Sequence, residues 1–192
     1  MEHITLPLTR KQTASLRAGS RQLLSGVVYT ARDAAHKRLV AILAAGERLP
    51  FSLAGSCIYY AGPTPPVPGR VIGAVGPTTS GRMDAYTPRL LSVGLLAMIG
   101  KGERSDAVVS AMKKGGAVYF GALGGAGALL SSRVKESQVA AFPDLGTEAI
   151  HRLVVEDFPV TVVIDCNGNN LYKTGRQAFL AWKAQIGRAQ WN

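Results

Sequence analysis

Residues 22–46, QLLSGVVYTARDAAHKRLVAILAAG, decide the fold class of this chain. Their first part, QLLSGVVYT (22–30), is a short β-type run and predicts a strand. Residues 33–45 place apolar side chains at helical spacing, begin with Asp33 and stop at Gly46, which predicts a helix. A strand followed at once by a helix is the building unit of an α/β domain, and we expect that fold class.

The rest of the chain repeats this alternation of strands and helices. Strands are predicted at residues 4–8, 56–63, 70–77, 117–123 and 151–165, the last as two runs that meet at residues 157–159. Helices are predicted at residues 84–98, 105–113 and 176–186, and the glycine-rich turn at 124–132 opens a further helix. Residues 63–69 (PTPPVPG) predict an extended loop, and Asn167-Gly168, after VTVVID (160–165), predicts a β-hairpin.

The composition fits one globular domain over residues 1–192, because 47% of the residues are hydrophobic and 18% are charged. The two cysteines, Cys57 and Cys166, lie far apart and have no Cys or His at metal-ligand spacing. We therefore expect reduced cysteines, no metal ligand in this chain and a cytoplasmic location. No stretch reaches the roughly 18 apolar residues of a membrane span, so no membrane association is expected.

The formal net charge of +10 predicts an anionic partner or ligand. Residues 1–50 hold eight basic and three acidic side chains, and residues 171–192 hold four basic and no acidic ones. The basic residues are scattered rather than clustered with aromatic ones, and no nucleic-acid-binding module is recognisable. An anionic substrate or protein surface is therefore favoured over nucleic acid.

The segment most indicative of chemistry is GPTTSGRMDAYTP, residues 76–88. Between a predicted strand and a predicted helix it brings together backbone N–H groups, the hydroxyls of Thr78 and Thr79 and the guanidinium of Arg82. Such a cluster suits an anion. A capping turn without any ligand explains the same residues equally well.

Three other segments offer candidate contacts. Arg32 follows a strand, where α/β folds usually place ligands, and its guanidinium can hold a carboxylate with two hydrogen bonds. Lys101 lies between two glycines and has two explanations: its ammonium group binds an anionic ligand, or it stabilises a helix C-terminus by interacting with the helix dipole. The residues alone favour the second explanation. His36 is interpreted as structural. The run GALGGAGA (121–128) lacks the Gly-x-Gly-x-x-Gly spacing, so it predicts close packing or a backbone wall rather than a nucleotide site.

No complete catalytic set can be recognised in the sequence. The sequence shows no Ser/His/Asp or Cys/His arrangement, no pair of carboxylates flanked by turn residues and no cluster of cysteines. The chain therefore looks like half of a site.

Five segments, in their order and spacing, resemble one enzyme family. They are GVVYTARDAAHKRL (26–39), GSCIYYAGP (55–63), GPTTSGRMDAYTP (76–88), IGKG (99–102) and DLGTEAI (144–150). The combination is similar to the beta subunit of two-subunit class I fumarases, a domain that forms the C-terminal part of the single-chain enzymes. It covers about residues 15–170. The resemblance implies the swivelling β/β/α domain as the fold.

The resemblance also implies a site shared by two chains. In that family a 4Fe–4S cluster is held by cysteines of an alpha subunit, which explains the lack of ligands here. The implied substrate-contacting residues are Arg32, Thr78, Arg82 and Lys101, with Thr78 as the catalytic base, and those that shape the pocket are Gly76, Thr79 and Gly81. The implied substrate is a C4 dicarboxylate such as fumarate or malate, and the implied assembly is an α2β2 heterotetramer.

Two alternatives stay open. Tartrate dehydratase beta subunits are similar, but they tend to carry a bulkier residue before the arginine, so Gly81 and the continuation DAYTP (84–88) favour a fumarase over a dehydratase of another 2-hydroxy-dicarboxylate. The alternative from a different class is a non-catalytic module that binds a phosphate or nucleotide with its glycine-rich loops.

Overall fold

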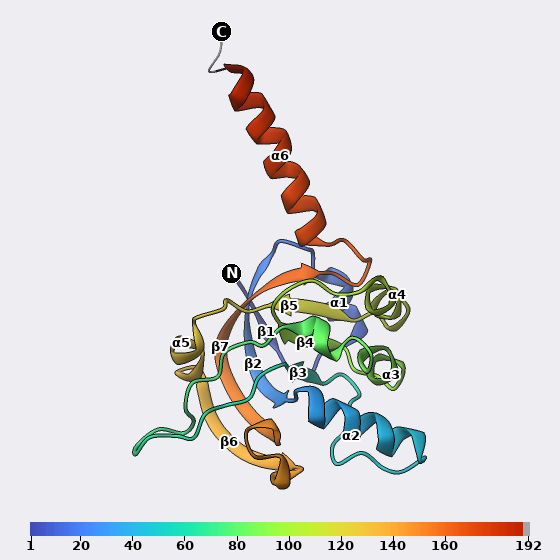
Figure 1. Cartoon of the computed structure of the whole chain (residues 1–192), viewed down its shortest axis with the longest axis vertical. Coiled ribbons are helices and arrows are strands. Elements are labelled where there is room, and N and C mark those ends of the chain that lie inside the picture. The colour runs from blue at the N-terminus through green and yellow to red at the C-terminus, as the bar shows by residue number, and fades with distance from the viewer. Residues whose placement is uncertain (190–192) are drawn as a thin grey trace.

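The computed structural model describes residues 1–189, which form a mixed α/β structure (Figure 1). The strands are β1 (Glu2–Thr5), β2 (Arg21–Thr30), β3 (Cys57–Tyr59), β4 (Ala97–Gly100), β5 (Val118–Gly121), β6 (Val134–Ala141) and β7 (Ile150–Ile164). The α-helices are α1 (Arg10–Ser15), α2 (Asp33–Ala44), α3 (Thr87–Ser92), α4 (Asp106–Gly115), α5 (Gly127–Ser131) and α6 (Leu171–Ala189). The 3-10 helices are η1 (Ser80–Met83) and η2 (Pro143–Glu148).

Part of the sheet closes into a small barrel. The strand order is β1-β2-β3-β4-β5-β7-β6, and β2 pairs with β7 as well. Strands β2, β3, β4 and β5 are parallel, while β7 runs antiparallel to both β5 and β2 and so closes the ring. β7 is 15 residues long and contains Asp157 in a left-handed conformation with φ of 51°. This long strand pairs with β2, β5 and β6.

Alternate residues of the parallel strands belong to two different cores, because successive side chains of a strand point to opposite faces. Tyr59 and Phe120 belong to a buried cluster to which β2, β3, β4, β5 and β7 all contribute. Their sequence neighbours Ile58 and Tyr119 belong to a second cluster, together with buried residues of α2, α3 and α4. These three helices lie along one side of the sheet, and α5 lies on the other side (Figure 1).

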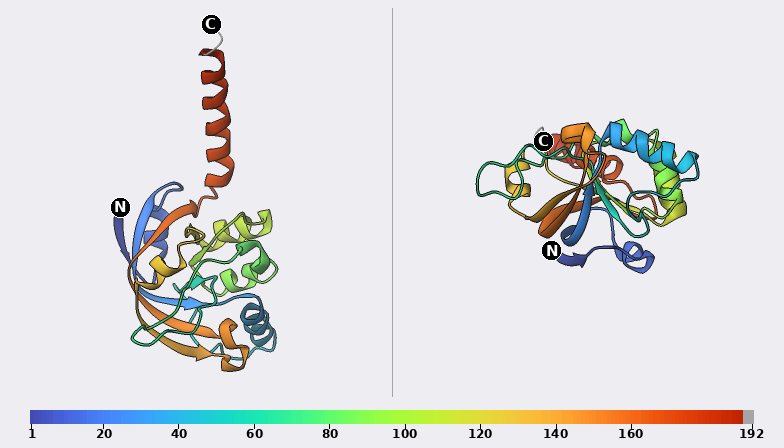
Figure 2. Two further views of the ribbon diagram at one scale, coloured as in Figure 1. Left: turned by 60° about the vertical axis from the view of Figure 1, so that its left-hand side comes forward. Right: turned by 90° about the horizontal axis from the view of Figure 1, so that it is seen from below.

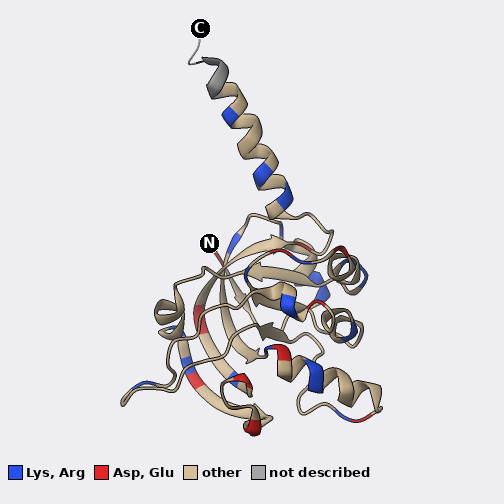
Figure 3. Cartoon of the chain, in the orientation of Figure 1, with Lys and Arg blue, Asp and Glu red and all other residues tan. Residues whose placement is uncertain are grey.

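Helix α6 extends away from this body (Figure 2). Its side chains are exposed from residue 176 to residue 185, and Phe179, Leu180 and Trp182 are 53–56% exposed. The residues of this helix that are coloured by charge in Figure 3 are all basic. Among the helices of residues 1–189, none has the length and apolar composition needed to cross a membrane.

The strand predicted at residues 70–77 is wrong, since these residues form an irregular loop. Their backbone groups bond to the preceding loop: Thr64 N donates to Ala74 O at 3.1 Å, and Gly73 N donates to Thr64 O at 3.1 Å. Strands β3, β4 and β5 already have a partner on each side. No edge of this part of the sheet is therefore left for another strand.

The helix predicted at residues 84–98 is too long. α3 ends at Ser92, Gly94 takes a left-handed φ of 104°, and residues 97 and 98 belong to β4. All residues of β4 are buried, and a short continuous apolar run does not distinguish a strand from a helix. As a result Lys101 follows a strand rather than a helix, and the explanation of Lys101 by a helix dipole is wrong.

The other predicted elements are present, with shifted ends. β2 and α2 confirm the strand at 22–30 and the helix at 33–45. Helix α1, strand β6 and the two 3-10 helices were not predicted, and β7 is one strand instead of two. The hairpin predicted at Asn167-Gly168 is wrong, because the turn there leads into α6. The side chains of β6 do not alternate between buried and exposed. Its sequence therefore lacks the alternation of apolar and polar residues that predicts a strand.

Candidate active site

The residues singled out in the sequence gather at the carboxyl ends of β2, β3 and β4. Arg32 lies just beyond β2, Tyr60 follows β3 and Lys101 follows β4. The carboxyl ends of parallel strands meet at one edge of a sheet, and α/β folds bind their ligands there. Residues that are far apart in the sequence therefore come together at this edge.

Backbone hydrogen bonds attach the segment before η1 to these strand ends. Thr78 donates twice to Tyr60 O, from its N at 2.7 Å and from its Oγ1 at 2.8 Å. Thr79 forms a parallel bridge with Lys101. In this bridge Lys101 N donates to Thr78 O at 3.3 Å, and Ser80 N donates to Lys101 O at 2.9 Å. Thr78, Thr79 and Lys101 are therefore direct neighbours.

Arg32 and Arg82 are held by two carboxylates to which the sequence analysis gave no role. Arg32 Nη2 lies 3.2 Å from Glu148 Oε1, and Glu148 Oε2 accepts a hydrogen bond from Ala34 N at 3.1 Å. Asp33 Oδ1 accepts from Arg82 Nε at 2.8 Å, and Asp33 Oδ2 lies 3.9 Å from Arg32 Nε. Asp33 therefore lies between the two arginines. Two features of the sequence could have pointed to these carboxylates. Asp33 is the neighbour of Arg32, and Glu148 lies in the segment DLGTEAI, which carries the family resemblance.

Lys101 is exposed and contributes a charge without a local counter-charge. Within residues 1–189 no carboxylate lies at ion-pair distance from it, in contrast to Arg32 and Arg82. A Cβ added to Gly124 would lie 3.8 Å from Lys101 Nζ, so the glycine-rich turn runs alongside this side chain. This position fits the expectation that the turn forms a backbone wall.

The glycines of the candidate site differ in how much space a larger side chain would have. Gly76 packs closely on the start of α5: a Cβ on Gly127 would lie 3.1 Å from Gly76 N, and Val75 N donates to Gly127 O at 3.2 Å. This is the close packing expected of the glycine-rich run. Among residues 1–189, a Cβ on Gly81 would meet only Glu103 O, at 3.8 Å, so no contact described here requires a glycine at this position.

His36 is a buried neutral residue that supports Arg32. Its Nδ1 donates to Arg32 O at 2.9 Å, and its Nε2 has no hydrogen-bond partner among the described residues. Burial lowers the pKa of His36 to about 4, although the bond to Arg32 O acts in the opposite direction. This environment agrees with the structural interpretation of the residue.

The stability of the chain is expected to fall below neutral pH because of His36. The unfolded imidazole binds a proton near pH 6.5, and the folded one only near pH 4. Between these values the unfolded state binds more protons, so the free energy of unfolding decreases as the pH falls, by about 3 kcal/mol in total. Urea unfolding of the wild type and His36→Gln at pH 7, 5.5 and 4.5 measures this, and the variant should show the flatter pH dependence.

The exposed His3 provides the control, because His3→Gln should keep the pH dependence of the wild type. Parallel curves for wild type and His36→Gln would show that burial of this imidazole does not influence stability.

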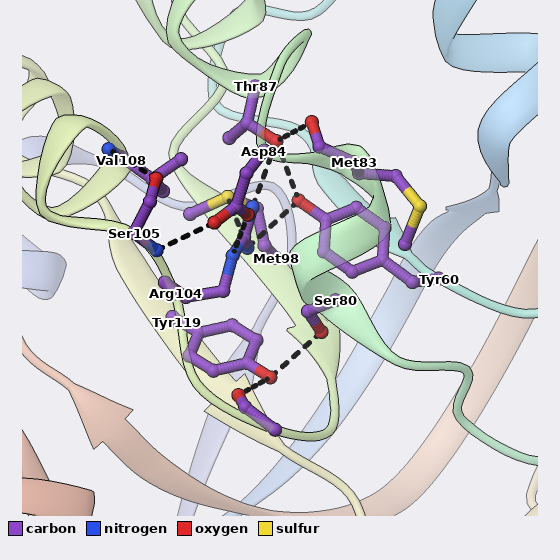
Figure 4. Close-up of polar contacts among 11 residues, drawn as sticks. Tyr60, Ser80, Met83, Asp84, Thr87, Met98, Arg104, Ser105, Val108 and Tyr119 are labelled. Atoms are coloured by element: carbon purple, nitrogen blue, oxygen red, sulfur yellow. Dashed lines mark hydrogen bonds and ion pairs between the residues drawn. The ribbon is translucent and has the colours of Figure 1, made fainter.

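A buried arginine that the sequence analysis missed lies beneath η1 (Figure 4). The side chain of Arg104 is 0% exposed and donates to Asp84 Oδ1 at 2.7 Å, to Thr87 Oγ1 at 2.9 Å and to Tyr60 Oη at 3.1 Å. Its guanidinium also lies 5.2 Å from the ring centre of Tyr119. Burial disfavours the charge, but Tyr60 and Asp84 outweigh it and raise the pKa of Arg104. The network joins η1 and α3 to β4 and β5.

The potential metal ligands of the chain are not gathered in one place among the described residues. Within residues 1–189, no group of three or more His, Cys, Asp and Glu side chains is arranged to hold a metal ion. Cys57 is completely buried, and burial raises the pKa of its thiol, which disfavours the thiolate that iron requires. Cys166 is the second free cysteine and is partly buried at the end of β7.

A family model described as "Fumarase C-terminus" matches residues 1–175. The chain belongs to this fumarase family. The matched range includes the whole candidate site, from Arg32 to Glu148, and it ends within the first turns of α6.

Individual relatives with this fumarase domain are similar over most of the chain. Fumarate hydratase 2 of Leishmania major is 41% identical over 165 residues, which cover 85% of this chain and 29% of that protein. The anaerobic class I fumarate hydratase of Escherichia coli strain K12 is 39% identical over 164 residues, 84% of this chain and 30% of that protein. The putative L(+)-tartrate dehydratase subunit beta of Methanocaldococcus jannaschii is 37% identical over 179 residues, 90% of this chain and 92% of that subunit.

The chain thus spans less than a third of the fumarate hydratases, at 29% and 30% of their lengths, but nearly all of the tartrate dehydratase subunit. These relatives are hydro-lyases by name, and the chain corresponds to one domain or subunit of such enzymes.

Proposed function

We propose that this chain is the beta subunit of a heteromeric iron–sulfur hydro-lyase that catalyses the reversible hydration of fumarate to (S)-malate. The observation that carries the proposal is the convergence of Arg32, Thr78, Arg82 and Lys101 at the carboxyl ends of three parallel strands in a member of the fumarase family. The three cations can bind a small dianion, and the threonine can take a proton from it.

The three cations bind and orient the substrate in this proposal. Fumarate and malate are dianions, and Lys101 supplies a positive charge that no carboxylate of residues 1–189 neutralises. Asp33 engages Arg82 through Nε, which leaves Nη1 and Nη2 for a substrate carboxylate. Glu148 holds the guanidinium of Arg32 through its Nη2 at 3.2 Å, and Asp33 Oδ2 adds a negative charge 3.9 Å from its Nε, beyond hydrogen-bond distance. Fixed cations of this kind select one orientation of the reacting carbons.

Thr78 is the proposed catalytic base. Removal of the proton beside a carboxylate of malate concentrates negative charge on that carboxylate, and the fixed cations stabilise it. The hydroxyl of Thr78 donates to Tyr60 O at 2.8 Å, so its lone pairs are available on the other side. A threonine is a poor base alone: as it takes the proton from carbon, its own hydroxyl proton must leave Tyr60 O and pass to a carboxylate. We assign that carboxylate to the partner subunit.

The partner is proposed to be an alpha subunit that carries the 4Fe–4S cluster, in an α2β2 assembly. Free Cys57 in the core and the lack of a metal-holding group within residues 1–189 support placing the cluster there. The subunit-sized relative, covered over 92% of its length, supports a separate beta chain. We further propose that residues 1–192 form a single cytoplasmic domain of the swivelling β/β/α type, with the small barrel as its core.

Dehydration of L-tartrate is the second candidate function. The similarity to a tartrate dehydratase beta subunit over nearly its whole length favours it, and Gly81 favours fumarate. The binding-module alternative has less support, because the glycine-rich run opens a helix of only five residues and packs on Gly76.

The test is a steady-state assay of the chain together with its cluster-bearing partner, prepared without oxygen. Rates are measured with fumarate, mesaconate and L-tartrate, and the cluster content is checked by iron analysis and absorbance. We expect the highest kcat/KM with fumarate. A higher value with L-tartrate would reassign the substrate, and no reaction with any of the three despite an intact cluster would overturn the proposed function.

A further inference from the structure

The peptide groups on both sides of Gly102 are held by two tyrosine hydroxyls. Tyr119 Oη donates to Gly102 O at 3.0 Å, and Gly102 N donates to Tyr172 Oη at 3.0 Å. Gly102 follows Lys101 directly and has a φ of 82°, a conformation that glycine adopts readily. Glycine has wide backbone freedom, so these two bonds extend the hold on the chain past Lys101, whose own N and O are bonded to Thr78 O and Ser80 N.

Tyr119 also connects this peptide to η1 (Figure 4). Its single hydroxyl proton is used for Gly102 O, so Ser80 Oγ donates to Tyr119 Oη, across 2.8 Å. Tyr119 and Ser80 are both 0% exposed, and Ser80 is the first residue of the helix that carries Arg82. One hydroxyl group therefore joins the Lys101 segment to the Arg82 segment from below.

Tyr172 holds the same peptide from a different part of the fold. It lies in the first turn of α6, and its backbone N donates to Asn170 Oδ1 at 3.0 Å. The preceding turn is fixed by Asp165, which is 0% exposed and accepts hydrogen bonds from Asn167 N at 3.0 Å and Asn169 N at 3.1 Å. The position of the Tyr172 hydroxyl is thus set by a rigid turn.

We propose that Tyr119 and Tyr172 are positioning residues that direct Lys101 toward the substrate by holding the Gly102 peptide from two sides. The inference rests on the proposed function, in which Lys101 binds a substrate carboxylate. Tyr119 is completely buried, and its hydroxyl is used by Gly102 O and Ser80 Oγ, so it acts on the substrate only through the Gly102 peptide. Tyr172 acts by accepting from Gly102 N. Loss of either bond loosens the chain next to Lys101, and a displaced ammonium group binds the dianion less well.

The test measures kcat and KM for fumarate in the complete enzyme with Tyr119→Phe or Tyr172→Phe. Tyr172→Phe loses the bond from Gly102 N, and Tyr119→Phe loses the bonds to Gly102 O and from Ser80 Oγ, so KM should rise by about 2–10-fold, with a smaller change in kcat. Tyr29→Phe is the matched control, because Tyr29 lies in β2 and stacks on Phe51 with ring centres 3.9 Å apart. Its KM should equal that of the wild type.

The same substitutions in a Lys101→Ala background separate positioning from general structural support. Once the ammonium group is absent, its direction no longer matters, so Tyr172→Phe should raise KM by less than about 2-fold in this background. A full additional effect there, or a wild-type KM in both single tyrosine variants, would overturn the inference and leave the proposed function standing. A wild-type kcat/KM in Lys101→Ala would overturn both. If Tyr119→Phe does not fold, Tyr172→Phe alone decides the result.

Discussion

Thr78→Val in the complete enzyme is expected to lower kcat for fumarate hydration by about 10²–10⁴-fold, the usual contribution of a positioned acid or base. Valine has nearly the shape of threonine, and Tyr60 O still accepts a hydrogen bond from the backbone N of residue 78 at 2.7 Å. The substitution therefore removes a hydroxyl without leaving a buried carbonyl unpaired. KM should change much less than kcat, because the three cations remain. Steady-state rates over a range of fumarate concentrations provide both constants.

Thr78→Ser is the matched control for this loss. Serine keeps a hydroxyl that can donate to Tyr60 O, so it should recover most of the activity. A valine variant with wild-type kcat would remove Thr78 from the chemistry, and equal losses in the serine and valine variants would show that the hydroxyl alone does not account for the activity.

Arg104→Met is expected to lower the free energy of unfolding by about 3–5 kcal/mol, because it breaks a buried ion pair and leaves one partner behind. The side chains of Arg104 and Asp84 are 0% and 15% exposed, and they meet at 2.7 Å. Thr87 and Tyr60 would lose a hydrogen-bond donor at the same time. Urea denaturation of the wild type and the variant, followed by circular dichroism, measures the difference.

Two comparisons identify the cause of that loss. Arg104→Met combined with Asp84→Asn should be more stable than Arg104→Met alone, because no buried carboxylate is left without its cation. Arg38→Met removes the exposed pair with Asp144 and should have little effect. A loss in Arg104→Met as small as that in Arg38→Met would show that the buried network contributes little to stability.

The fold was predictable where the hydrophobic period was unambiguous. The run at 22–30 and the helical spacing at 33–45 correspond to β2 and α2. Prediction failed for apolar segments without a period: residues 97 and 98 were taken as helix although they belong to β4, and residues 70–77 were taken as a strand although β3, β4 and β5 already have a partner on each side. Local pattern does not record which edges of a sheet are occupied, and that decides these cases.

The candidate site was predictable in part for the same reason. The motif around Thr78 and Arg82 was visible as a polar, glycine-rich turn between apolar segments. Lys101 could not be separated from a helix-end lysine until β4 was known to precede it. Glu148 had no recognisable role, because its contact with Arg32 joins segments more than a hundred residues apart. Asp33 was recognised only as the start of a helix, since its ion pair with Arg82 joins two separate segments.

The sequence by itself determined the α/β class, the positive charge and the polar residue types suited to an anion, since these depend on composition and on short-range spacing. Only the tertiary structure decided that Arg32, Thr78 and Lys101 share one edge of a barrel and that two tyrosines hold the peptide beside Lys101. The physical reason is that these contacts arise from strand order and from hydrogen bonds between distant segments, and such pairings leave no period in the sequence.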